Sequence, residues 1–142
     1  MYFADLTPYA YRHSLALPEV LNVGWLDDQH PYTQGHVPKD LVEKLAAASH
    51  RLRTHPTRGV HACPFCARIH GEHVPRDAMG SAELWLRAPS GQIYASPELV
   101  VHYIRAHEYR PPIDWLAACD LDDPTWNPQQ TARELHWRAM ER

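Results

Sequence analysis

A pair of cysteines and a later pair of histidines constrain this chain more than any other feature. Cys63-Pro-Phe-Cys66 has C-x-x-C spacing, in which a tight turn lets two sulfur atoms converge on one point. His102 and His107 follow after 35 intervening residues, with H-x4-H spacing. Thiolate and imidazole groups at such spacings are the usual ligands of a tetrahedral zinc ion. The sequence therefore predicts one structural Zn²⁺ held by all four side chains.

The segment between the two pairs is expected to fold rather than to act as a linker. Residues 82–87 and 92–95 look like two strands, and residues 88–91 have the composition of a turn, so a hairpin is predicted. Ser96-Pro97 combines a preferred N-cap with a residue preferred at the first helical position. A helix is therefore predicted over residues 96–109, and it would carry both histidines.

The order of knuckle, hairpin and helix over residues 59–110 resembles the treble-clef and related finger families of CCHH zinc modules. In those families a C-x-x-C knuckle and a ligand pair near the following helix share one structural zinc, which implies the four ligands named above. Two features depart from the pattern. The gap between the pairs is long, and helix positions five apart point about 140° away from each other. We expect a distorted final helical turn to bring both histidines to one ion.

A second ligand set lies close to the cysteines. Cys63, Cys66, His70 and His73 fall within eleven residues, and His61 flanks them. This set would close a very small loop and would leave the helical histidines unused, so we favour His102 and His107. The other histidines are interpreted as surface or core-edge residues; they are His13, His30, His36, His50, His55 and His136.

The cysteine pair also allows a redox interpretation. Cys63-Pro-Phe-Cys66 is similar to the active-site sequence of glutaredoxin-like thiol oxidoreductases, in which the first cysteine has a lowered pKa. That fold continues into a long helix, whereas Gly71 and Pro75 follow here within ten residues. No βαβ pattern precedes the motif either. Thiol–disulfide exchange by Cys63 and Cys66 is kept as an alternative function.

Two kinds of catalytic zinc site are disfavoured by spacing and order. A zinc hydrolase would need H-E-x-x-H, and the residues from His102 to His107 lack both that spacing and the glutamate. A zinc deaminase would need H-x-E before its cysteines, but His70-Gly-Glu72 follows them. The sequence therefore predicts no catalytic residues, and the protein is interpreted as a non-enzyme.

The charge of the chain bears on its partner. The net charge of −3 argues against a general nucleic-acid coat, which needs an excess of Lys and Arg. Arginines near the knuckle could contact phosphates, and Trp85 or Tyr94 could stack on bases. Packing in the core is the preferred role for both rings. We expect another protein as the partner, with a nucleic-acid-binding zinc module as a disfavoured alternative.

Sequence features also bear on the compartment. No apolar stretch of about eighteen residues is present and the amino terminus lacks the pattern of a signal peptide, so no membrane span or export is expected. Three cysteines, two of them in one pair, do not form a secreted disulfide framework. A reducing cytoplasm is predicted, and Cys119, in an apolar segment, is interpreted as a buried inert thiol.

Residues 1–142 are predicted to form a single α+β domain, in which the zinc knuckle, hairpin and helix over 59–110 pack with flanking helices. The clearest helix covers residues 38–53, with Leu41, Leu45, Ala48 and Leu52 on one stripe. The other elements expected are a strand at 21–26, a helix at 113–119, and a last helix from Asn127-Pro128 with Leu135 and Met140 facing inward.

Three further stretches, at residues 3–9, 23–27 and 102–112, resemble those of small uncharacterised bacterial cytoplasmic proteins. This resemblance implies a class of protein and a compartment, and it brings no activity with it. The function that we predict is that of a non-catalytic, zinc-stabilised module for partner binding or regulation.

Overall fold

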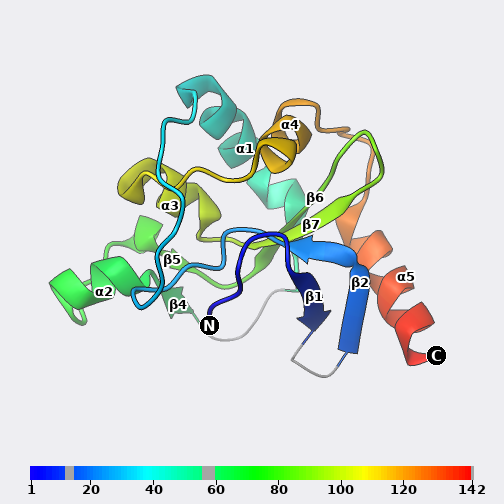
Figure 1. Cartoon of the computed structure of the whole chain (residues 1–142), viewed down its shortest axis with the longest axis horizontal. Coiled ribbons are helices and arrows are strands. Elements are labelled where there is room, and N and C mark those ends of the chain that lie inside the picture. The colour runs from blue at the N-terminus through cyan, green and yellow to red at the C-terminus, as the bar shows by residue number, and fades with distance from the viewer. Residues whose placement is uncertain (12–14, 56–59, 142) are drawn as a thin grey trace.

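A five-stranded sheet runs through the centre of the molecule (Figure 1). The computed structural model describes residues 1–11, 15–55 and 60–141, so the expectations for His13 and for Gly59 lie outside the described residues. The strand order is β1-β2-β7-β6-β3; β2 and β7 are parallel, and the other neighbours are antiparallel. The strands are β1 (Pro8–Tyr11), β2 (Leu15–Asn22), β3 (Arg53–Thr54), β6 (Glu83–Arg87) and β7 (Ile93–Pro97).

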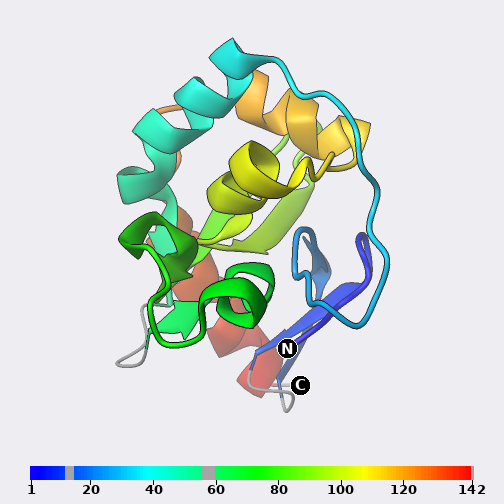
Figure 2. The same ribbon diagram turned by 90° about the vertical axis from the view of Figure 1, so that its left-hand side faces the viewer.

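Helices cover both faces of this sheet. Figure 2 shows α1 (Lys39–Leu52), α3 (Val100–His107) and α4 (Ile113–Asp120) on one side and α5 (Pro128–Met140) on the other. Helices pack on a sheet whose strands pair mostly antiparallel, which confirms the predicted α+β class. Within the described residues, no helix combines the length and the apolar character that crossing a membrane requires.

The centre of the sheet is apolar on both faces because both are covered. All five residues of β7 are buried, and in β6 Leu84, Trp85 and Leu86 are fully buried. The two strands form the predicted hairpin, and Gly91 in its turn has a φ of +96°, a conformation that favours glycine. Trp85 and Tyr94 lie in the core, as the sequence indicated.

The predicted start of the histidine-bearing helix is wrong. Ser96 and Pro97 belong to β7, where Ser96 pairs with Leu84, and the helix begins three residues after Pro97 at Val100. Ser96 is fully buried and its hydroxyl accepts a hydrogen bond from Trp115 Nε1 at 3.1 Å, so it serves tertiary packing instead of capping a helix.

Two other predicted helices are confirmed with small corrections. In α1 the buried positions include Leu45 and Leu52, as predicted, and also Val42. In α5, Asn127 caps the helix by accepting a hydrogen bond from the backbone N–H of Gln130 at 3.0 Å. Leu135 is buried, but Met140 is 64% exposed, so its inward placement was wrong.

The amino-terminal third contains more regular structure than its sequence indicated. The strand expected at residues 21–26 lies earlier, as β2 over Leu15–Asn22. Beyond Asn22 the chain leaves the sheet, and Trp25 forms an isolated bridge with Phe3. The bounds of β2 are set by its pairing with β7, which lies some seventy residues later in the chain. The local sequence pattern around β2 gives no sign of this pairing.

The residues around the cysteine pair form a small substructure of their own, the 60–80 segment. It contains β4 (His61–Ala62), α2 (Pro64–His70), a short 3-10 helix (Arg76–Ala78) and β5 (Met79–Gly80), with β4 and β5 paired as a two-stranded sheet. No helix was expected here. The segment lies at the end of the molecule opposite α5 (Figure 1).

Candidate metal centre

The turn at Cys63 presents two sulfur atoms side by side. The backbone N–H of Cys63 donates to the carbonyl of Ala78 at 2.7 Å, which ties the turn to the 3-10 helix. Pro64 occupies the first position of α2, where its missing N–H costs nothing. The N–H of Cys66 points at the Cys63 sulfur over 3.5 Å. Such N–H···S contacts favour a thiolate, which is the form that binds a metal.

Helix α3 supplies the two histidines from its first and last turns. His107 is the final residue of α3, and Glu108 follows in the left-handed region with a φ of 57°. The hydroxyl of Tyr32 donates to the carbonyl of His107 at 2.8 Å. Residues 102–107 all belong to α3, and the chain departs from helical geometry only after His107, at Glu108. The side chains approach from different sides, with ring planes 75° apart.

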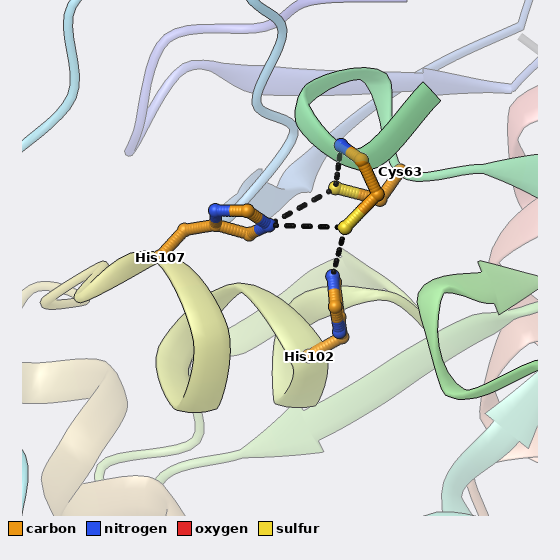
Figure 3. A group of neighbouring side chains, drawn as sticks. Cys63, His102 and His107 are labelled. Atoms are coloured by element: carbon orange, nitrogen blue, oxygen red, sulfur yellow. Dashed lines mark hydrogen bonds between the residues drawn. The ribbon is translucent and has the colours of Figure 1, made fainter. Parts of the chain in front are cut away.

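The four side chains meet at one point (Figure 3). Their ligand atoms, Sγ of Cys63 and Cys66 and Nε2 of His102 and His107, all lie within 4.8 Å of one another. The Cys63–His107 and Cys66–His102 distances are both 3.4 Å, and Cys66–His107 is 3.6 Å. A tetrahedral zinc with ordinary bond lengths requires sulfur–nitrogen separations of about 3.6 Å. We call these residues the CCHH group; it could hold a metal ion.

Burial sets the protonation of this group. It raises the pKa of the Cys63 thiol to about 11, because the low-dielectric surroundings disfavour the thiolate. Burial also lowers the pKa of His102 and of His107, and the charge of His107 adds to the effect on His102. Both imidazoles are therefore held in the neutral form that can ligate. The thiolate form requires a nearby positive charge, and a bound metal cation would supply it.

The local alternative does not assemble in the structure. His70 and His73 are exposed, and neither belongs to the group of ligand atoms that converges on the cysteine sulfurs. Cys119 lies apart from the site and is buried, as expected for an inert thiol. Burial, with smaller contributions from Asp122 and Asp120, raises its pKa well above the ordinary value.

A second group of polar side chains was missed by the sequence analysis. Glu83 Oε1 accepts hydrogen bonds from the Tyr9 hydroxyl at 2.9 Å and from Trp85 Nε1 at 2.8 Å, and it lies 3.0 Å from His55 Nδ1. His55 Nε2 in turn lies 2.9 Å from His136 Nε2. We call these five residues the Glu83 cluster. They come from β1, the residue after β3, β6 and α5, so no linear motif could have found them.

The Glu83 cluster borders a cavity of about 630 Å³. Tyr9, His55 and Glu83 line one part of its wall, and the 60–80 segment contributes another through His61 and Pro64. His136 lies behind His55 and does not line the cavity. The cavity is therefore separate from the CCHH group, although both involve the 60–80 segment.

Comparison with known proteins identifies one family. Residues 1–120 match the family described as "Domain of unknown function (DUF7919)". The match includes the whole CCHH group and every residue that lines the cavity, whereas His136 falls outside it. No curated protein and no solved structure matches the chain.

Proposed function

Because the chain belongs to the DUF7919 family, whose description names no activity, we propose a function from the site itself. The protein is a non-catalytic, zinc-stabilised module that binds a partner or regulates one. One structural Zn²⁺ is held by Cys63, Cys66, His102 and His107. The metal joins the 60–80 segment to α3, so its binding free energy becomes folding free energy.

The convergence of the CCHH group carries this proposal. Two sulfurs and two neutral imidazoles, with sulfur–nitrogen distances of 3.4 to 3.6 Å, match the donor set and the size of a structural zinc site. Four protein ligands complete a tetrahedron and leave no coordination position for water or substrate. Such a site stabilises a fold and performs no hydrolysis.

The order of elements supports a treble-clef-like arrangement for the site. The C-x-x-C turn before α2 comes first, the β6–β7 hairpin follows, and α3 supplies the second ligand pair. The site departs from that family in the long gap between the two ligand pairs and in the five-residue spacing of His102 and His107 along α3. We also propose a reducing compartment, in which Cys63 and Cys66 remain available as metal ligands.

Observations on Cys63 weigh against the redox alternative. A nucleophilic thiol needs a lowered pKa and solvent access, whereas Cys63 is fully buried and burial raises its pKa.

The surface of the 60–80 segment bears on the kind of partner. This segment exposes the apolar side chains of Val60, Ile69 and Met79. Exposed apolar residues favour a protein surface over a phosphate backbone as the contact.

Elemental analysis of the untagged protein tests the proposal. We expect about one zinc per chain, and we expect the zinc-loaded protein to leave a mixed disulfide unreduced. A folded, zinc-free protein that reduces the disulfide would replace the proposal with the redox function. Binding to nucleic acid that weakens steeply with salt would instead support the nucleic-acid alternative.

A further inference from the structure

The cavity beside the Glu83 cluster combines aromatic rings with carboxylates. Phe3, Trp25 and Tyr103 contribute aromatic surface to its wall, and Asp27 and Glu98 contribute carboxylates in addition to Glu83. Among the described residues, the lining includes no lysine or arginine, and it includes the amino-terminal residue Met1. A pocket of this size with an aromatic wall suits a small organic ligand, and its three carboxylates favour a cation over an anion.

Two of the three carboxylates are neutralised or capped by neighbours. Glu98 pairs with the guanidinium of Arg53 at 2.7 Å and accepts a hydrogen bond from the backbone N–H of Ser81 at 2.9 Å. Asp27, whose side chain is 21% exposed, lies 2.7 Å from His30 Nδ1 and accepts a hydrogen bond from the backbone N–H of Gln29 at 3.1 Å. Neither carboxylate requires a ligand to balance its charge.

Glu83 differs from both, because it is largely buried without a lysine or arginine partner among the described residues. Its side chain is 16% exposed, and its only ion-pair partner there is His55. Oε1 receives contacts from Tyr9, Trp85 and His55, whereas Oε2, within the described part of the chain, accepts only a 3.0 Å hydrogen bond from the Tyr9 hydroxyl. A carboxylate can accept about four hydrogen bonds, so Oε2 retains capacity for a further donor.

The histidine pair can leave the Glu83 charge in place. If His55 donates from Nδ1 to Glu83, its Nε2 accepts from Nε2–H of His136, and both imidazoles are neutral. Burial and the neighbouring His55 lower the pKa of His136, which favours this arrangement. A buried carboxylate held only by neutral donors is stabilised strongly by a cation.

We propose that this cavity binds a small organic cation, a primary ammonium group on an aromatic or aliphatic body. The ammonium donates to Oε2 of Glu83. The body packs against Phe3 and Trp25, and their rings add cation–π attraction where the charge lies over a ring face. This binding site goes beyond the proposed zinc-stabilised function and shares none of the four CCHH residues, so either can fail without the other.

Three probes with the same aromatic body and different charges test the proposal by calorimetry on the zinc-loaded full chain. They are phenethylammonium, the neutral phenethyl alcohol and the anion hydrocinnamate. We expect phenethylammonium to bind about tenfold more tightly than hydrocinnamate, with the alcohol between them. Equal or tighter binding of hydrocinnamate would overturn the proposal, and so would the absence of phenethylammonium binding up to millimolar concentration.

A matched pair of variants locates the charge that matters. Glu83→Gln keeps the shape and removes the charge, and we expect it to weaken phenethylammonium about tenfold while it changes the alcohol much less. Glu72→Gln, at an exposed position away from the cavity, serves as the control and is expected to bind as the wild type does. If Glu83→Gln does not fold, the ranking of the three probes on the wild type still decides. Equal weakening by both variants would contradict the role of Glu83.

Discussion

The CCHH group and the Glu83 cluster both join distant segments, but they are held together differently. In the CCHH group the contacts are sulfur–nitrogen distances of 3.4 to 3.6 Å, at which thiols and imidazoles hydrogen-bond only weakly. In the Glu83 cluster the contacts to the carboxylate are nitrogen–oxygen and oxygen–oxygen distances of 2.8 to 3.0 Å, and the two histidine nitrogens are 2.9 Å apart, so each contact can pair a donor with an acceptor.

The difference shows which cluster depends on something from outside the chain. Four ligand atoms that satisfy one another poorly cost free energy when buried, and a metal ion converts that cost into stabilisation. In the Glu83 cluster each contact pairs a donor with an acceptor, so the cluster stabilises the fold without a ligand, although Oε2 of Glu83 can accept one more donor. The first should therefore fail as a unit when metal is withdrawn, and the second should change gradually with charge.

Metal removal is expected to give the largest effect. Structural zinc sites contribute about 10–16 kcal/mol in isolated modules, as much as the total stability of an ordinary domain. We expect chelation to unfold the 60–80 segment and to weaken the packing of α3, while the hairpin of β6 and β7 exchanges its amide protons more slowly. Hydrogen exchange resolved along the chain, with and without chelator, measures this. Unchanged protection of the 60–80 segment would remove the distinction between the two clusters.

Exchanging single histidines sharpens the assignment. His107→Ala removes a proposed ligand that lies 3.4 Å from Cys63, whereas His70→Ala removes an exposed ring of the 60–80 segment. We expect the first to lower zinc affinity by more than about 100-fold, because even the loss of an outer-shell partner costs up to that much. His70→Ala should retain zinc as the wild type does. Competition with a chromogenic chelator measures both, and the reverse ranking would move the site to the cysteine-proximal set.

The CCHH group could be predicted because the spacing of its cysteines and histidines in the sequence is typical of zinc ligands. C-x-x-C and H-x4-H fix which residue types lie near each other within one turn or one helix, and few other roles demand that combination. The sequence could not reveal how two positions five apart reach one point. That depends on the end of α3 at Glu108 and on the side chains approaching from two sides.

The Glu83 cluster could not be predicted because its residues come from distant parts of the sequence and meet only in the folded structure. His55 and His136 are 81 residues apart, and nothing in the sequence near either one distinguishes it from a surface histidine.

The helix start predicted at Ser96-Pro97 was wrong for the same reason, because tertiary contacts are not visible in the local sequence. Local preference favours a helix there, but pairing with β6 and the hydrogen bond from Trp115 hold those residues in β7. Local signals were enough to predict α1 from its apolar stripe and α5 from its N-cap, because both signals agree with the tertiary structure.

Neutralising the centre of the Glu83 cluster should have an intermediate effect. Glu83→Gln replaces one of two acceptor oxygens by a donor, so the hydroxyl of Tyr9 and the Nε1–H of Trp85 must share a single acceptor. We expect the free energy of unfolding to fall by about 2 kcal/mol, the usual cost of leaving a buried polar group unsatisfied. Urea denaturation of the zinc-loaded protein measures it, with Glu72→Gln as the control. A loss as large as that of a zinc ligand would mean that this cluster also requires an ion.

The smallest expected effect is a dependence on pH that arises from His136. Burial and His55 lower its pKa from the ordinary value of 6.5, so between the folded-state pKa and 6.5 the unfolded chain binds more protons. The free energy of unfolding should therefore fall as the pH drops through that window. His136→Gln removes the titrating group, so the difference in stability between wild type and variant should shrink between about pH 7.5 and 5.5. Protonation of the zinc ligands affects both proteins equally and cancels in this difference.

Trp137→Gln is the control for the His136 variant. Trp137 occupies the next position of α5 and is exposed, so this substitution should show no such change relative to the wild type. A difference that grows as the pH falls would mean that His136 is protonated in the folded state, and it would assign the positive charge beside Glu83 to the histidine pair.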